Sequence, residues 1–126
     1  MTQMSISEFV ERYDLYDRGI EDIIEENNGM RFVFSMFHCD DPERDDEKKE
    51  YLLNATFNQS DVSVVTGELR QNFKNTDGEI LDFSFNKDVL KIGISWRDYS
   101  TKQTSWCEIE IRGDATDVRE HILEIV

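Results

Sequence analysis

The amino-acid sequence predicts an α+β fold made mainly of an antiparallel β meander, either a curved sheet or a small sandwich, with a short N-terminal helix. Two observations carry this prediction. Residues 81–112 alternate apolar and polar side chains with a period of two, in segments joined by short polar turns. Residues 5–13 instead repeat their apolar side chains at helical spacing. A chain of 126 residues has the usual length of one domain, here residues 1–126.

The helix is predicted from a start signal and one apolar face. Ser5 and Glu8 have the spacing of a capping box, in which each side chain bonds the backbone of the other residue. Asp14 to Gly19 forms a polar exit from the helix. The apolar positions that follow at one helical face are Ile6, Phe9, Val10 and Tyr13.

Two strands are predicted next, joined by a turn at Asn27-Asn28-Gly29. Residues 20–26 are rich in β-branched side chains, although the spacing of their isoleucines also suits a helix. In residues 30–39 both faces are apolar. This pattern is typical of a central strand covered on both sides.

The middle of the chain is more polar. Residues 40–50 carry seven acidic and three basic side chains and are predicted to form an exposed loop. Residues 51–57 alternate like a strand, and a short strand is expected within 61–67. Residues 69–73 suit a connector or a helical turn, and residues 75–78 suit a turn.

The meander occupies the last third. In its first strand Leu81, Phe83 and Phe85 are expected on one face, and residues 86–88 form a tight turn. The second and third strands are expected at 90–97 and 107–112, with a polar loop at 98–104 between them. Val118, His121, Ile122 and Ile125 then have helical spacing, so a C-terminal helix is expected, with a final short strand as the alternative.

Charge excludes several partners. The chain has 28 acidic and 14 basic residues, a net charge of -14. Phosphate backbones and anionic membrane surfaces would be repelled, and no basic patch offsets this, so neither nucleic acid nor membrane is expected as a partner. A basic protein partner would be attracted and steered. The alternative is that the acidity serves solubility alone.

The sequence contains no recognisable catalytic or metal-binding motif. Residues 1–10 lack the features of an export signal, so a reducing cytoplasm with free Cys39 and Cys107 is expected. Neither cysteine has the spacing of a zinc ligand or the context of a nucleophile, whether paired with His38 or His121. Residues 40–47 lack the EF-hand pattern. No enzymatic activity, cofactor or metal is therefore predicted.

The aromatic residues around 98–104 are candidate contacts. Trp96 continues an apolar strand face and is expected in the core, whereas Trp106 falls on the opposite, polar face of its strand. Tyr99 lies in the loop and fits either role. The residues predicted to bind a partner are Asp40, Asp41, Glu43, Asp45, Asp46, Glu47, Tyr99 and Trp106.

The segment from Tyr13 to Asp17, followed by Ile20, Ile23 and the turn at 27–29, resembles the opening of small bacterial proteins that include immunity-type proteins of toxin systems. Tyr16 stands where that family has histidine, and Arg18 stands where it has serine. The resemblance covers about thirty residues and carries over no functional residue. It implies a binding role in a bacterial cytoplasm.

These observations predict a non-catalytic protein-binding module, an acidic intracellular inhibitor or immunity-type protein that neutralises a cationic partner such as a nuclease. One alternative is a small-ligand-binding domain or minor enzyme with a pocket on the sheet face. The other is a structural subunit of an assembly, which an exposed apolar patch would indicate.

Overall fold

The computed structural model describes residues 2–27, 29–37, 50–69 and 75–122. Antiparallel sheet dominates these residues, and one short α-helix lies near the N-terminus, which confirms the predicted fold class. The elements in chain order are β1 (Thr2–Ser5), α1 (Ile6–Arg12), β2 (Gly19–Glu26), β3 (Gly29–Phe37), β4 (Glu50–Asn58), the 3-10 turn η2 (Gln59–Asp61), β5 (Val62–Thr66), β6 (Thr76–Asn86), β7 (Val89–Asp98), β8 (Gln103–Ile111) and β9 (Ala115–Ile122).

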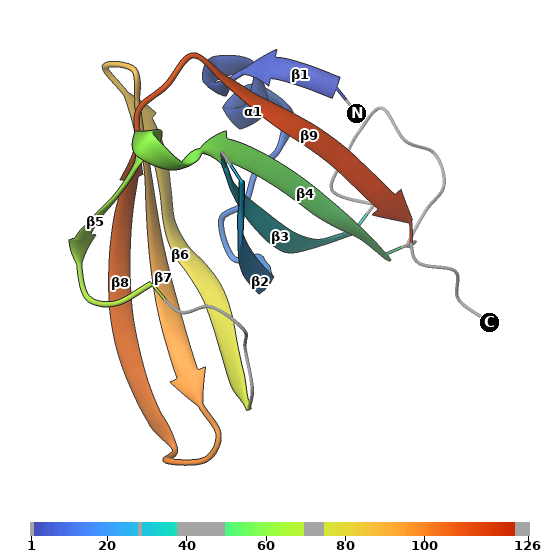
Figure 1. Ribbon diagram of the computed structural model, residues 1–126. Coiled ribbons are helices and arrows are strands. Elements are labelled where there is room, and N and C mark those ends of the chain that lie inside the picture. The colour runs from blue at the N-terminus through green and yellow to red at the C-terminus, as the bar shows by residue number, and fades with distance from the viewer. Residues whose placement is uncertain (1, 28, 38–49, 70–74, 123–126) are drawn as a thin grey trace.

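The nine strands of the described residues belong to one sheet, with the order β1-β9-β4-β3-β2-β6-β7-β8-β5. Figure 1 shows that the sheet bends into two parts, here called the first arm (β1, β9, β4, β3 and β2) and the second arm (β6, β7, β8 and β5). The inner faces of both arms and one side of α1 contribute to a single buried cluster. The outer faces point away from this core.

The helix forms as predicted, because Ser5 caps it. The Ser5 side chain accepts a hydrogen bond from the backbone N–H of Glu8 at 3.0 Å. Phe9 is completely buried, with its ring 5.8 Å from the ring of Phe57 in an edge-on arrangement. Tyr13 follows the helix and donates a hydrogen bond to Glu120 at 3.0 Å, which ties this segment to β9.

The meander is confirmed with one shift of register. A β-bulge between Ile80 and Asp82 places Ile80 in the core and leaves Leu81 42% exposed. The expectation that Leu81 shares a face with Phe83 and Phe85 is therefore wrong. The predicted turn at 75–78 is also wrong, because Thr76 to Gly78 pair with β7 and extend β6. The turn at 86–88 is confirmed, with positive φ at Lys87 and Asp88.

The predicted C-terminal helix is wrong, and the alternative strand is correct. Residues 115–122 form β9, which pairs with β4 on one side and β1 on the other. Val118 is buried on the inner face, and the buried hydroxyl of Thr116 donates to the carbonyl of Thr56 at 3.0 Å. These residues form a strand despite their helical spacing, because as a strand they pair with both β4 and β1. A two-turn helix would leave the backbone groups of those two strands unpaired.

The two arms meet at a narrow join. Between β2 and β6 only two residue pairs form, Gly19 with Glu79 and Ile20 with Gly78. Backbone hydrogen bonds extend the join into the preceding turn, from the Asp17 N–H to the Ile80 carbonyl at 2.7 Å and from the Ile80 N–H to the Arg18 carbonyl at 2.9 Å. Few backbone pairs therefore connect the arms, and the shared buried cluster provides most of the contact between them.

Two carboxyl groups face each other at this join. A hydrogen bond with Asp17, together with partial desolvation and the negative charge of Asp17, raises the pKa of Glu79 above its ordinary value of 4.5. The folded state therefore binds this proton more tightly than the unfolded chain. Its contribution to stability is fully present below about 4.5 and is lost as the pH rises through the raised pKa.

We expect the substitution Glu79→Gln to remove this pH dependence. The amide keeps a hydrogen bond to Asp17 without the repulsion, so the variant should gain stability at neutral pH relative to the parent chain and gain little below pH 4. Urea unfolding across this pH range measures the effect. A parent and variant whose stabilities change in parallel with pH would contradict it.

A candidate protein-binding groove

The outer face of the first arm is hollowed into a broad groove of about 1380 Å³. Its floor consists of outward-pointing side chains of β3, β4 and β9, brought into rows by the strand register. One row runs from Asp22 through Val33 and Asn54 to Arg119. A second runs from Arg31 through Thr56 to Asp117. Period-two alternation creates this face, since the same strands bury Phe32, Leu53 and Val118 on the other side.

This face bears on the prediction for residues 30–39. The inner positions of β3, from Met30 to Met36, are buried as expected. Arg31, Val33 and Ser35 point outward, where Val33 is buried and Arg31 and Ser35 are partly exposed. Arg31 and Val33 line the groove. The strand is central in its arm, between β2 and β4. Its inner face lies in the core, and its outer face is covered in part, at Val33. His38 and Cys39 lie outside the described residues.

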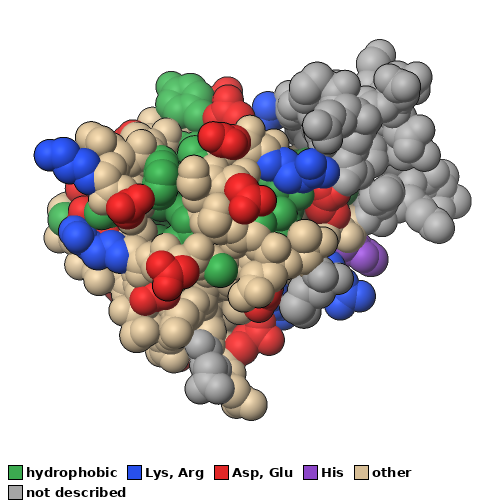
Figure 2. All heavy atoms as spheres, turned by 90° about the horizontal axis from the view of Figure 1, so that it is seen from above, with side chains coloured by type: hydrophobic (Ala, Val, Ile, Leu, Met, Phe, Trp, Pro, Cys, Tyr) green, Lys and Arg blue, Asp and Glu red, His purple; other side chains and the backbone are tan. Residues whose placement is uncertain are grey.

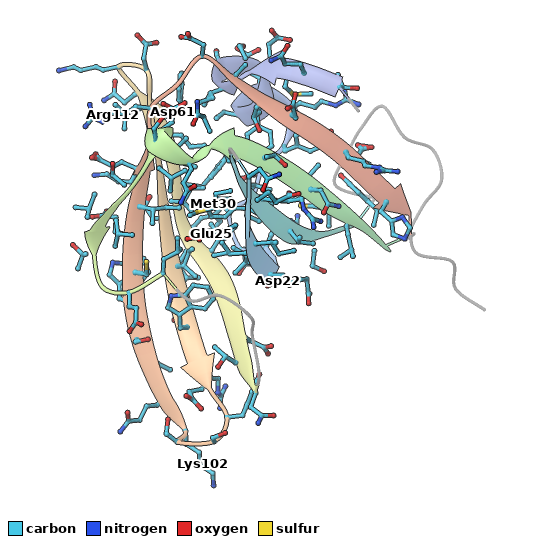
Figure 3. All side chains as sticks on the ribbon, viewed as in Figure 1. Asp22, Glu25, Met30, Asp61, Lys102 and Arg112 are labelled. Carbon is cyan, nitrogen blue, oxygen red and sulfur yellow. The ribbon has the colours of Figure 1, made fainter. Side chains whose placement is uncertain are left out.

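The groove is acidic. Six carboxylates line it against two arginines, a ratio more negative than that of the whole chain. The acidic residues are Glu21, Asp22, Glu26, Asp61, Asp114 and Asp117, the arginines are Arg31 and Arg119, and His121 also lines it. A β-bulge in β2, between Ile20 and Asp22, brings both Glu21 and Asp22 to this side. Figure 3 shows Asp22 on β2 and Asp61 far from it, beside the start of β5.

One arginine is already engaged. The Arg31 guanidinium donates from Nε to Glu26 and from Nη1 to the amide oxygen of Asn54, each at 2.8 Å. This clamp fixes Arg31 between two strands and takes up part of its charge. The remaining carboxylates are then opposed mainly by Arg119. By contrast, Figure 2 shows acidic and basic side chains interspersed over the end of the molecule seen from above.

The predicted contact residues fall in three places. Asp40, Asp41, Glu43, Asp45, Asp46 and Glu47 all lie outside the described residues. Tyr99 is 51% exposed in the β7–β8 turn, where its hydroxyl donates to Asp77 and the Arg97 guanidinium lies 5.6 Å from its ring centre. Trp106 is 42% exposed on the outer face of β8, and neither aromatic residue lines the groove.

A glycine positions Trp106. The indole lies against the backbone of Gly93, where an added Cβ atom would come within 2.5 Å of the ring. Trp96, on the inner face, is 1% exposed and donates from Nε1 to the Glu68 carbonyl at 3.2 Å. The sequence alternation therefore assigned both tryptophans to the correct faces.

The Cys–His pair that involves described residues does not form. Cys107 is a free thiol buried on the inner face of β8, and burial raises its pKa, which disfavours the reactive thiolate. His121 lies on the outer face of β9 and lines the groove. Among the described residues, no group of three or more His, Cys, Asp or Glu side chains is placed to hold a metal ion.

Sequence reasoning missed the groove acids. The available signal was the outward phase of β2 and of residues 114–121, but the bulge in β2 and the helical spacing of the last segment hid it. Comparison of the chain with protein-family models, with curated proteins and with solved structures found no match. No helix in the described ranges is both long and apolar enough to cross a membrane.

Proposed function

We propose that this chain is a non-catalytic protein-binding module, an acidic intracellular inhibitor of the immunity type, which neutralises a cationic protein by accepting one of its basic segments in the outer groove of the first arm. The observation that supports this proposal best is the groove itself, which six carboxylates line against two arginines, one of them held by Glu26 and Asn54. Such a cavity focuses negative potential and steers a cationic protein toward it.

The dimensions of the groove favour a polypeptide over a small molecule. Its volume of about 1380 Å³ is larger than the roughly 300–1,000 Å³ typical of small-molecule pockets. Charged and amide side chains dominate the lining, whereas small-molecule sites are mostly apolar. A lysine- or arginine-rich segment would place its cations against both walls, with Asp22 and Glu21 at one side and Asp114 and Asp117 at the other.

Fluorescently labelled decalysine is a direct probe of this site. We expect the triple variant Glu21→Gln, Asp22→Asn, Asp117→Asn to bind it about tenfold more weakly, since each lost charge pair near a surface is worth roughly 0.5 kcal/mol. Binding to the parent chain should weaken steadily between roughly 0.05 M and roughly 0.3 M salt, because screening shortens the range of the attraction. Fluorescence anisotropy measures both effects.

The control changes the net charge equally at other sites. The variant Glu11→Gln, Asp82→Asn, Asp88→Asn also removes three negative charges, but from α1, β6 and the β6–β7 turn. None of these three residues lines the groove. It should bind decalysine within about twofold of the parent, because distant exposed charges are largely screened. Equal losses in the two triple variants would show that net charge alone drives binding and would contradict a groove-specific site.

A further inference from the structure

The free edge of β5 is unusual for this chain. Among the described strands β5 pairs with β8 alone and ends the sheet. Its sequence, Val-Ser-Val-Val-Thr, contains no charge, although a third of all residues in the chain are charged. Val64 and Val65 are 48% and 51% exposed. Edge strands are usually protected by short length, bulges, lysine, proline or inward charges, because an open row of backbone groups recruits further strands. β5 is short and has a bulge between Val64 and Thr66, but it contains no lysine, proline or charge.

Acidic side chains flank this edge. Across the β5–β8 ladder Ser63 lies opposite Glu110 and Thr66 lies opposite Glu108. A strand added beyond β5 would lie about 10 Å from β8, two inter-strand spacings away, so a lysine or arginine reaching over the small Ser63 side chain could meet these carboxylates. Their present partners are weak and exposed: Lys91 stands 3.8 Å from Glu108, and Arg112 stands 3.2 Å from Glu110.

We infer that β5 is a second contact site, at which an extended segment of the cationic partner adds as a tenth strand. Main-chain hydrogen bonds to β5 would provide affinity, and basic side chains on the outer face would provide selectivity through Glu108 and Glu110. This inference rests on the proposed cationic partner, but it concerns a different surface from the groove.

Charge favours such a partner over a second copy of this chain. Two copies paired through β5 would bring together two molecules of net charge -14. A segment of alternating lysine and valine matches both the apolar side chains of β5 and the carboxylates of β8. Its valines would lie beside Val62 and Val64, and its lysines would lie beside the carboxylates.

The test uses a seven-residue peptide, Lys-Val-Lys-Val-Lys-Val-Lys, and the same peptide with all of its backbone amides N-methylated. Methylation preserves charge but removes the donors that pair with a strand edge. We expect the methylated peptide to bind at least about tenfold more weakly, and the unmethylated peptide to protect amides of residues 62–66 from hydrogen exchange. The double variant Glu108→Gln, Glu110→Gln should bind the unmethylated peptide about fivefold more weakly.

Three outcomes would overturn the inference: equal binding of the two peptides, protection confined to strands other than β5, or a concentration-dependent dimer of the free chain that the peptide does not dissociate. The last would assign the edge to a second copy. The triple variant Glu21→Gln, Asp22→Asn, Asp117→Asn separates this test from that of the groove, since it should lose decalysine binding while amides 62–66 remain protected by the peptide.

Discussion

Replacing Gly78 by valine is expected to reduce the free energy of unfolding by about 3 kcal/mol, the upper part of the range for overpacked buried sites. Gly78 is buried at the join between the arms, where it pairs with Ile20. A Cβ atom there would lie 2.3 Å from a methyl group of Ile20 and 2.7 Å from the ring of Trp96. Neither neighbour has room to move, because both are part of the core.

Gly19 provides the matched control at the same join. An added Cβ atom at Gly19 meets nothing closer than 3.8 Å, which is ordinary contact distance. Gly19→Ala should therefore change stability by less than about 1 kcal/mol. Urea unfolding followed by circular dichroism measures both variants, with equal slopes required for the comparison. If Gly78→Val were as stable as Gly19→Ala, that result would contradict the close packing of Ile20 and Trp96 around Gly78.

Phe32→Ala should cost about 3–5 kcal/mol, the usual loss when a fully buried phenylalanine leaves a cavity. Phe32 is completely buried on the inner face of β3. Its ring stacks on Phe34 with centres 6.1 Å apart and meets Phe57 edge-on at 5.8 Å. The loss removes aromatic contacts from two strands at once, and these strands also form the floor of the groove.

Leu81→Ala is the comparison that tests the bulge in β6. The period of two assigns Leu81 to the core, whereas the structure leaves it 42% exposed. We expect a loss below about 1 kcal/mol for this large-to-small change, measured by the same urea unfolding. A loss of stability near that of Phe32→Ala would indicate that β6 has no bulge and that Leu81, not Ile80, lies in the core.

The fold class was predictable because most strands obey a single periodic rule. Along β4, β7 and β8 the buried apolar positions recur with a period of two, from Tyr51 to Ile111, so alternation identifies the strands although Leu52 and Trp106 lie on the outer face. The N-terminal helix was predictable from Ser5 and Glu8, since its capping depends on residues only three positions apart.

The errors arise where pairing between distant segments overrides local pattern. Residues 76–78 look like a turn, yet β7 pairs with them because its strand is long enough to reach them. Residues 115–122 look helical, yet they complete the gap between β4 and β1. Bulges at Glu21 and Leu81 reverse the phase of the following residues, and nothing in a single sequence marks where such an extra residue falls.

The candidate site was predictable in chemistry but not in place. The net charge predicts acidic surface, and six carboxylates line the groove. The carboxylates of the groove come from β2, η2, the segment before β9 and β9 itself. They are separated by up to about a hundred residues in the sequence. Only the register of the sheet brings Asp22 and Asp117 to the same face, and that register is a property of the fold.

The central claim is that a cationic segment binds the outer groove of the first arm. The most direct measurement is an NMR titration of the isotope-labelled chain with decalysine, followed through its backbone amide signals. We predict that the largest shift changes map to the groove residues of β2, β3, β4 and β9, and that the variant Glu21→Gln, Asp22→Asn, Asp117→Asn needs about tenfold more decalysine to produce them. Changes confined to residues 40–47, or to the outer face around Tyr99 and Trp106, would contradict the claim.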